Sequence, residues 1–316
     1  MHALPPAIFI MGPTASGKTN AAVYLKQHLP VELISVDSAL VFQDMNIGTA
    51  KPEPAVLRQA PHFLVDIILP THAYSAANFR EDALKLMHEI TARGNIPVLV
   101  GGTMLYFKSL VSGLSGLPEA NATIRAQLDA EAAIIGWPGM HTKLAAIDPE
   151  TAARLKPNDM QRIQRALEVY AIAGETMTQL HAKQQAQTLP YRVLKMALEP
   201  SDRSVLHARI ATRFQQMLAD GLVEEVSALL DKYPTLTIES TSMRCVGYRQ
   251  VLEYMQGQYL LEELCDRGIF ATRQLAKRQL TWLRSMEDTV TLDCLDVQLN
   301  AQVKALVQNF LSEQVS

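Results

Sequence analysis

An α/β fold with a parallel sheet is predicted by two features of the sequence. Short apolar runs without polar alternation are followed by turn residues and then by helical patterns, which is typical of buried parallel strands connected through helices. The stretch from about residue 119 to residue 188 contains no such run and has helical spacing instead. We therefore expect a parallel α/β core that is interrupted by an inserted all-helical domain.

Five apolar runs account for the predicted strands: Ala7–Met11, Leu33–Val36, Phe63–Ile67, Pro97–Val100 and Val193–Leu198. The last run follows the helical stretch, so the chain returns to the sheet after the insertion. The predicted domains are residues 1–118 and 190–316 for the two parts of the core, with C-terminal helices in the second part, and residues 119–189 for the insertion.

Three helices are placed by their caps and by apolar residues at helical spacing. Asp159, next to Asn158, is a suitable cap for a helix in the insertion that ends at Gly174. Asp202 is a suitable cap for a second helix. The apolar side of that helix consists of Leu206, Ile210, Phe214 and Met217. A third helix is expected from about Leu260 to Arg284.

Composition excludes several classes of protein. The chain has 316 residues, of which 48% are hydrophobic and 19% are charged, so it is neither disordered nor collagen-like. A net charge of −3 excludes a uniformly basic surface but allows local basic patches. Cys245, Cys265 and Cys294 show no CxxC spacing, so we expect neither a disulfide framework nor a structural zinc site.

Membrane and export patterns are not found in the sequence. No apolar run approaches the roughly 20 residues that cross a bilayer, and the run at residues 7–11 is too short for a signal peptide. We expect a cytoplasmic protein that does not span a membrane. We also expect a monomer, because the sequence has no heptad repeat and no extensive apolar surface pattern.

A phosphate-binding loop is the most specific local motif. The pattern G-x-x-x-x-G-K-[ST] is matched directly after the first predicted strand and at the start of a helix, by Gly12, Pro13, Thr14, Ala15, Ser16, Gly17, Lys18 and Thr19. Backbone N–H groups and the helix dipole hold phosphate oxygens in such loops. Lys18 is expected to neutralise phosphate charge and the Thr19 hydroxyl to coordinate Mg²⁺. The core is therefore predicted to be P-loop NTPase-like, with an ATP-binding motif that other enzymes that expel diphosphate also use.

Polar residues follow three other predicted strands. Asp37-Ser38 follows the second strand, Asp66 ends the third, and Gly101-Gly102-Thr103 follows the fourth. Ligands of open α/β sheets bind at the carboxyl ends of the strands, so we expect these residues to share a crevice with the phosphate loop. By itself, Asp37 has three interpretations: a metal ligand, a general base or a helix cap. An Asn-Lys-x-Asp guanine signature is not found in the sequence, which argues against a GTPase.

Basic residues gather in three segments of this mildly acidic chain. The segment from Arg267 to Ser285 has five basic residues and no acidic one. Residues 154–165 contain four basic residues and one acidic residue, and Arg244 and Arg249 flank Gly247-Tyr248. Basic residues mixed with amides and aromatic rings suit contacts with RNA phosphates and bases. Solvated helix faces have a similar composition, so these segments alone do not establish RNA binding.

With these motifs in this order, the sequence resembles the tRNA dimethylallyltransferases, also called tRNA isopentenyltransferases, over nearly its whole length. The matching stretches are Gly12–Thr19, Asp37–Ala39, Ile47–Pro52, Tyr74–Ala77, Gly101–Thr103, Pro157–Asp159, Gln161–Ile163, Arg213-Phe214, Val246–Gln250, Ala276–Gln279 and Trp282–Arg284. The resemblance implies transfer of a dimethylallyl group from dimethylallyl diphosphate to N6 of the adenosine just 3′ of the anticodon, in tRNAs that read codons beginning with U. It also implies Mg²⁺ as cofactor, an insertion that binds the anticodon stem-loop, and the bacterial form of the family.

Residue roles follow from the same resemblance. Asp37 is expected to orient the adenine amine and accept its proton, and Thr103 to touch the acceptor nucleotide. Lys18 and Arg213 are expected to stabilise charge on the leaving diphosphate. Besides Asp37 and Thr103, the predicted tRNA contacts are Ser38, Ala39, Leu40, Arg125, Gln161, Arg162, Ile163, Gln164, Arg165, Met243, Arg244, Cys245, Val246, Gly247, Lys277, Arg278, Gln279, Leu280, Thr281, Trp282, Leu283 and Arg284.

The sequence departs from the family pattern close to Asp37. Leu40 replaces a common glutamine, and Phe42-Gln43-Asp44 replaces Tyr-Arg-Gly, which removes positive charge near the site. Two other functions are compatible with the phosphate loop: a P-loop kinase that acts on a small molecule, and an RNA-binding ATPase switch. Neither accounts for the later motifs in their order.

Overall fold

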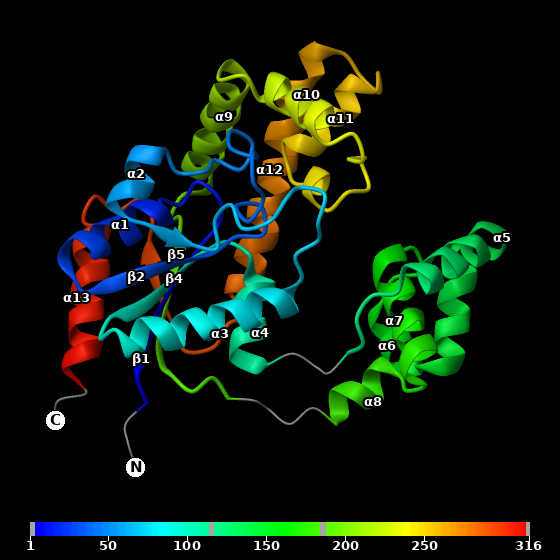
Figure 1. The fold of residues 1–316 in the computed structure, drawn as a ribbon, viewed down its shortest axis with the longest axis horizontal. Helices are drawn as coiled ribbons and strands as arrows, with labels where there is room; N and C mark the ends of the chain where they lie inside the picture. Colours follow the sequence, from blue (N-terminus) through cyan, green and yellow to red (C-terminus); the bar gives the residue numbers. More distant parts are fainter. Residues whose placement is uncertain (1–3, 114–116, 184–187, 314–316) are drawn as a thin grey trace. The chain divides into compact units, whose positions relative to one another are not determined.

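The computed structural model describes the chain apart from residues 1–3, 114–116, 184–187 and 314–316 (Figure 1). The chain divides into two compact units: residues 1–110 with 190–316, which we call the core unit, and residues 111–189, which we call the helical unit. The first boundary lies at residue 110 rather than at residue 118 as predicted, and it falls inside α4 (Met104–Ser112). The second boundary lies between residues 189 and 190.

The elements of the described residues, in chain order, are β1 (Pro6–Met11), α1 (Lys18–His28), β2 (Val31–Val36), α2 (Pro54–Gln59), β3 (His62–Phe63), α3 (Ala76–Ala92), β4 (Ile96–Gly101), α4 (Met104–Ser112), α5 (Ala122–Ile147), α6 (Pro149–Arg154), α7 (Met160–Ala173), α8 (Met177–Ala182), β5 (Arg192–Glu199), α9 (Arg203–Ala219), α10 (Leu222–Lys232), the 3₁₀ helix η1 (Ser242–Arg244), α11 (Tyr248–Met255), α12 (Leu261–Leu283), β6 (Thr289–Asp293) and α13 (Leu299–Ser312). No helix among them is both long and apolar enough to cross a membrane.

The strands of the core unit form one parallel sheet with the order β3-β2-β4-β1-β5-β6. The predicted α/β class and four of the five predicted strands are confirmed. The strand predicted at 63–67 is wrong beyond Phe63, because Leu64 and Asp66 have φ angles of 62° and 56° that interrupt the extended backbone. The edge strand β6 was not predicted, because its side chains are partly exposed and its sequence contains no continuous apolar run.

Helices cover both faces of this sheet (Figure 1). Successive side chains of a strand point to opposite faces, so Ile8 and Ile10 of β1 pack against the helices α1 and α13. Phe9 points the other way, and its ring lies 5.1 Å from the ring of Phe107 of α4, measured between centroids. Because β1 lies between β4 and β5, the loop that follows β1 leaves the sheet at the middle of its carboxyl edge.

The helical unit consists of helices α5 to α8 in the residues that the structure describes. Its core is formed mainly by α5 and α7, with Leu128, Met140, Leu144, Ile163 and Leu167 among its buried residues. α5 is kinked at Gly136, whose φ of 70° and ψ of 163° are not helical, just before Pro138. α7 starts and ends as predicted, at the caps Asp159 and Gly174.

Candidate active site

A cavity of about 650 Å³ lies at the carboxyl ends of β1, β2 and β4. The phosphate loop, the segments that follow β2 and β4, and the helices α9 and α12 line it. Among the predicted site residues, the cavity brings together Thr14, Ala15, Gly17, Lys18, Thr19, Asp37, Ser38, Ala39, Leu40, Thr103, Arg213, Arg244, Cys245, Val246, Arg278, Gln279 and Trp282. Segments from both halves of the core sequence therefore build one site.

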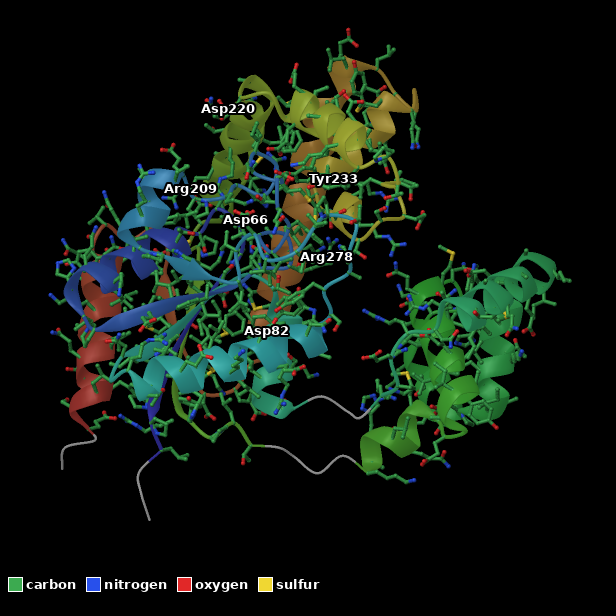
Figure 2. The ribbon with its side chains drawn as sticks, in the orientation of Figure 1. Asp66, Asp82, Arg209, Asp220, Tyr233 and Arg278 are labelled. Carbon is green, nitrogen blue, oxygen red and sulfur yellow. The ribbon has the colours of Figure 1, made fainter. Side chains whose placement is uncertain are left out.

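Asp66, which ends the predicted third strand, does not line this cavity, although His62 and Val65 of the same segment do. Asp66 forms an ion pair with Lys51, whose side chain is only 6% exposed. It lines a second cavity together with Arg209 and Asp220; Figure 2 labels all three residues. The left-handed φ angle of Leu64 ends β3 at Phe63, and Asp66 follows with a second left-handed φ angle.

The phosphate loop is shaped to receive an anion. Ala15 and Gly17 have left-handed φ angles of 63° and 80°, a backbone form that directs successive N–H groups into one concave surface. α1 begins at Lys18, and no side chain caps its first N–H groups. These groups and the positive end of the α1 dipole are therefore available to phosphate oxygens.

Two cations meet at this loop. Burial lowers the pKa of the Lys18 ammonium to about 8, the Asp37 carboxylate acts to raise it, and the Arg213 guanidinium lowers it further. Burial also lowers the pKa of Arg213. In the structure, the Lys18 Nζ donates to the Pro13 carbonyl oxygen at 2.6 Å. A bound diphosphate would offer both cations a compensating negative charge.

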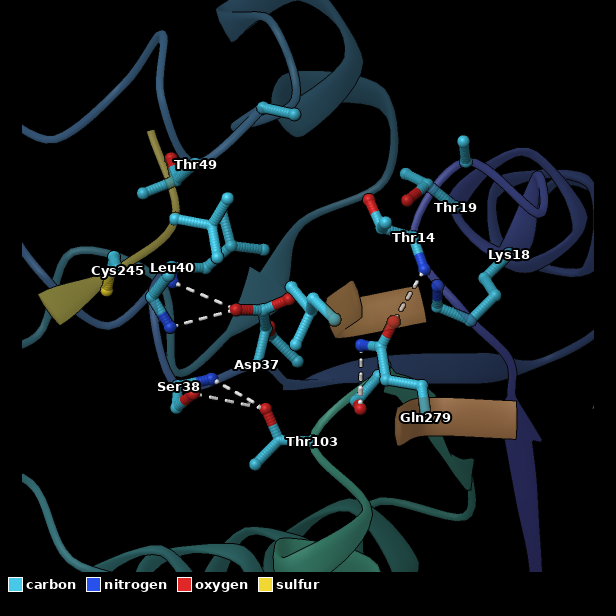
Figure 3. Close-up of a pocket in the computed structure, with 18 of the residues that line it drawn as sticks. Thr14, Lys18, Thr19, Asp37, Ser38, Leu40, Thr49, Thr103, Cys245 and Gln279 are labelled. Carbon is cyan, nitrogen blue, oxygen red and sulfur yellow. Dashed lines mark hydrogen bonds between the residues drawn. The ribbon is translucent and has the colours of Figure 1, made fainter. Parts of the chain in front are cut away.

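Asp37 is held at the end of β2 by its own turn. Its Oδ1 accepts the N–H groups of Ala39 at 2.8 Å and Leu40 at 3.4 Å (Figure 3). The Thr103 Oγ1 accepts the Ser38 N–H at 3.0 Å and lies 3.3 Å from the Ser38 Oγ. The end of β4 is thereby tied to the residue after Asp37, which brings the carboxylate and two hydroxyl groups to the same wall of the cavity.

The departures from the family pattern have structural partners. Leu40 contributes its backbone N–H to Asp37. Asp44 accepts hydrogen bonds from Lys232 at 2.8 Å and from the Tyr233 hydroxyl at 2.5 Å, and these bonds lower the pKa of Asp44. The Gln43 Nε2 donates to the Asp66 carbonyl oxygen at 3.1 Å. These two side chains therefore fix the segment that follows Asp37 rather than reach into the cavity.

An apolar wall completes the cavity, and its residues were not among those predicted for the site. It consists of Ile210, Phe214 and Met217 of α9 and Leu275 of α12. The apolar spacing of α9 was recognised, but a helix that packs against a core has the same spacing as one that lines a pocket. The position of Arg213 beside this run was the available signal, since an arginine next to an apolar wall favours an anionic ligand.

Other predicted contact residues do not line the cavity. The side chains of Ile163, Met243, Leu280 and Leu283 are buried, so only their backbones could touch RNA. Three residues of the phosphate loop do not line the cavity: Gly12, Pro13 and Ser16. The cavity lining also lacks four residues of the predicted tRNA contacts: Gly247, Lys277, Thr281 and Arg284. The Arg284 guanidinium donates to Glu199 at 3.3 Å.

In the helical unit, Arg125 and Arg165 have a partner within the protein. Both form ion pairs with Glu168, whose side chain is 0% exposed, at 2.9 Å and 2.6 Å. Gln164 donates to Asp129 at 2.6 Å. Gln161 and Arg162, at the start of α7, are exposed, and Arg162 forms an ion pair with Asp159 at 3.4 Å.

The donor set of the cavity fits Mg²⁺. The Thr19 hydroxyl and the Asp37 carboxylate line the same space, and Mg²⁺ prefers oxygen ligands, keeps several waters and often shares phosphate oxygens of a substrate. Within the described part of the chain, no group of three or more His, Cys, Asp or Glu side chains could hold a metal ion by itself. Magnesium at Thr19 would share phosphate oxygens with a bound substrate.

Comparisons with known proteins agree with this geometry. The IPP transferase family model matches residues 40–286. The tRNA dimethylallyltransferase of Methylobacillus flagellatus is 66% identical over 308 residues, which are 98% of each chain. The crystal structure of the tRNA isopentenylpyrophosphate transferase of Bacillus halodurans is 33% identical, with a TM-score of 0.72 over 99% of this chain and 98% of that one.

A eukaryotic dimethylallyltransferase, described as acting on tRNA, is 27% identical with a TM-score of 0.82 and matches 98% of this chain and 80% of its own. The family model spans most of the sequence, including Asp37's neighbour Leu40 and the basic helix α12. The bacterial relatives match over nearly their whole length. The chain therefore belongs to the IPP transferase family.

Proposed function

We propose that this chain transfers a dimethylallyl group from dimethylallyl diphosphate to N6 of the adenosine just 3′ of the anticodon, in tRNAs that read codons beginning with U, and releases diphosphate. The observation that carries the proposal is the composition of one cavity. It combines a phosphate loop with two cations, an apolar wall and a carboxylate at a fixed strand end. The names of the relatives support the same reaction.

The donor end of the cavity suits an allylic diphosphate. The N–H groups of the loop, Lys18 and Arg213 would bind the diphosphate and stabilise the charge that develops as the C–O bond breaks. Thr19 would hold Mg²⁺, which supplies further neutralisation of the leaving group. The wall formed by Ile210, Phe214 and Met217 would hold the five-carbon group, because apolar surface favours the transfer of such a group from water.

The acceptor end suits an adenine amine. The lone pair of N6 is delocalised into the ring, so the amine is a weak nucleophile. The Asp37 carboxylate would accept a hydrogen bond from the amine and take its proton as the C–N bond forms. Ser38 and Thr103 present hydroxyl groups to the same space and would orient the base.

The target base must leave its stack to enter this cavity, and unpaired loop bases do so at low cost. Arg244, Arg278 and Trp282 line the cavity and would contact phosphates and stack on bases. The helical unit, with Gln161 and Arg162 exposed, would contact the anticodon stem-loop. The monomeric state and the cytoplasmic location stay predictions.

The decisive experiment incubates the purified protein with Mg²⁺, dimethylallyl diphosphate and unmodified tRNA, without ATP, and weighs the digested nucleosides by mass spectrometry. A prenyl-sized mass increase on adenosine is expected. No increase with a competent control enzyme, together with ATP turnover, would contradict the proposal and favour the kinase or ATPase interpretation.

A variant pair tests the role of Asp37. Asp37→Asn should lower the single-turnover rate by about 10²- to 10⁴-fold, the usual contribution of a general base, while tRNA binding stays close to wild type. Asp266→Asn is the matched control, because Asp266 is exposed on α12 and lines neither cavity. A proportional loss of tRNA affinity in Asp37→Asn would remove the base assignment.

A further inference from the structure

Gln279 of α12 joins the two strand ends that carry the donor and acceptor groups of the site. Its Oε1 accepts the backbone N–H of Thr14 at 2.9 Å, and its Nε2 donates to the carbonyl oxygen of Gly102 at 3.0 Å (Figure 3). Thr14 belongs to the phosphate loop after β1. Gly102 directly precedes Thr103 after β4. One side chain therefore spans both loops.

The two Gln279 hydrogen bonds lie beyond the last paired residues of β1 and β4. The ladder between β1 and β4 pairs Ile10 with Val100 and ends with Met11 opposite Gly101. Beyond these pairs, the two loops diverge from the ladder. The Gln279 amide provides a donor and an acceptor from one rigid plane, so it can fix the separation of the loops after the strand hydrogen bonds have ended.

The Gln279 amide packs so close to Gly102 that this position has no room for a side chain. A Cβ atom on Gly102 would collide with the Gln279 Nε2 and would lie 3.3 Å from the Gly12 carbonyl oxygen. The Gly101-Gly102 pair of the sequence thus has a local reason at its second position: it leaves room for a side chain from α12.

The bond to Thr14 also changes the assignment of the phosphate loop. The Thr14 N–H points to Gln279, so a diphosphate would be bound by the N–H groups that follow it, at and before the start of α1. Thr14 still lines the cavity. We infer that Gln279 is a positioning residue, which sets the phosphate loop against the Asp37–Thr103 wall so that the allylic carbon and the acceptor amine come into line.

This inference rests on the proposed function and extends it to a residue that touches neither reacting atom. Gln279→Met keeps the length of the side chain and removes both hydrogen bonds. Gln274→Met is the matched control, since Gln274 lies on the same helix, is partly exposed and lines neither cavity. The readouts are the single-turnover rate of prenyl transfer at saturating substrates, the dissociation constants of dimethylallyl diphosphate and of tRNA, and the melting temperature.

Gln279→Met should lower the saturated rate about 10- to 100-fold, the range that small misplacements of reacting groups produce, while both dissociation constants change less than about threefold. The control should match wild type. An unchanged rate, or a loss explained entirely by weaker binding of one substrate, would overturn the inference.

A second variant keeps the test valid if Gln279→Met fails to fold. Gln279→Glu keeps the shape and the acceptor for Thr14 but loses the donor to Gly102. Its negative charge beside the phosphate loop should also weaken donor binding, so the readout for this variant is the rate at saturating donor, which should fall as it does in Gln279→Met. A wild-type rate for Gln279→Glu would overturn the bridge to Gly102. Failure of the proposed function is distinguishable, because the wild-type protein itself would then produce no prenylated adenosine.

Discussion

Replacing Glu168 by glutamine should destabilise the helical unit without changing the shape of the side chain. The Glu168 carboxylate is 0% exposed and accepts four hydrogen bonds. Oε1 accepts Arg125 Nε at 2.9 Å and the Asn121 N–H at 2.8 Å, and Oε2 accepts Arg165 at 2.6 Å and the second Arg125 donor at 3.2 Å. Glutamine would remove the charge and turn an amide N–H group toward a guanidinium donor.

The expected cost follows from how far water can replace the lost bonds. Removing one partner of a fully buried ion pair costs about 3–5 kcal/mol. Here the side chains of Arg125 and Arg165 are 43% and 28% exposed, so water can solvate part of each guanidinium. We therefore expect the free energy of unfolding of the helical unit to fall by about 2–3 kcal/mol.

The effect of pH has a defined sign. Burial raises the pKa of Glu168, but the hydrogen bonds from Arg125, Arg165 and the Asn121 N–H together lower the pKa below its usual value of 4.5. A carboxyl group with a lowered folded pKa stabilises the fold above its unfolded pKa and loses this contribution as the pH falls through the folded pKa. The difference between wild type and Glu168→Gln should be constant from pH 6 to pH 8 and should shrink below about pH 4.5.

The two tryptophans of the chain allow this measurement in the intact protein. Trp137 packs against the core of the helical unit, and Trp282 belongs to α12. In a Trp282→Phe background, urea unfolding followed by fluorescence reports on the helical unit alone. Glu119→Gln, at an exposed position, is the control. Equal stability of Glu168→Gln and its background at pH 7, or a difference that persists undiminished under acid conditions, would refute the reasoning.

Three further predictions concern the core unit. Glu225→Gln should lower the free energy of unfolding by about 1–3 kcal/mol, because Glu225 accepts hydrogen bonds from the backbone N–H groups of residues 46–48 and from the Tyr248 hydroxyl. Urea unfolding at pH 7 measures this change, and an unchanged free energy would contradict the prediction. The kcat/KM for dimethylallyl diphosphate should fall as the pH rises through about 8, because the free enzyme then loses the Lys18 proton; a profile that stays flat to pH 9.5 would contradict this role. Gly268→Ala should lower the free energy of unfolding by about 1–3 kcal/mol and weaken donor binding, because its Cβ would collide with the Phe214 ring of the cavity wall. A melting curve measures the loss of stability, and calorimetric titration with the diphosphate donor measures the loss of affinity. Wild-type values in both measurements would exclude the collision.

The predictions that depended on local patterns agreed best with the structure. The phosphate loop needs one strand, eight residues and one helix in sequence, and all of these are consecutive in the chain. The caps Asp159 and Asp202 also act on N–H groups two or three residues away. The phosphate loop and the helix caps depend on residues that are close together in the chain. They can therefore be predicted from a single sequence.

Predictions that depended on distant partners were less complete. Arg125 was assigned to RNA because it matches a tRNA contact of the family, yet its partner in the structure, Glu168, lies 43 residues later in the chain. The apolar wall was not assigned because Phe214 and Leu275 meet only after α9 and α12 have packed. Residue type indicates what a side chain can bind, but the fold decides which partner it meets.

The segment Ile47–Pro52 illustrates why a family motif does not by itself identify a chemical role. Gly48 has no room for a side chain, because the ring of Tyr248 occupies that space. The N–H groups of Ile47 and Gly48 bind Glu225, to which the Tyr248 hydroxyl also donates at 2.5 Å. The motifs at 47–52 and 246–250 thus meet through one carboxylate of α10. Thr49 and Val246 line the cavity and lie within two residues of these contacts in the chain. A change at Glu225 should therefore reach the active site through the backbone, although no reacting atom touches it.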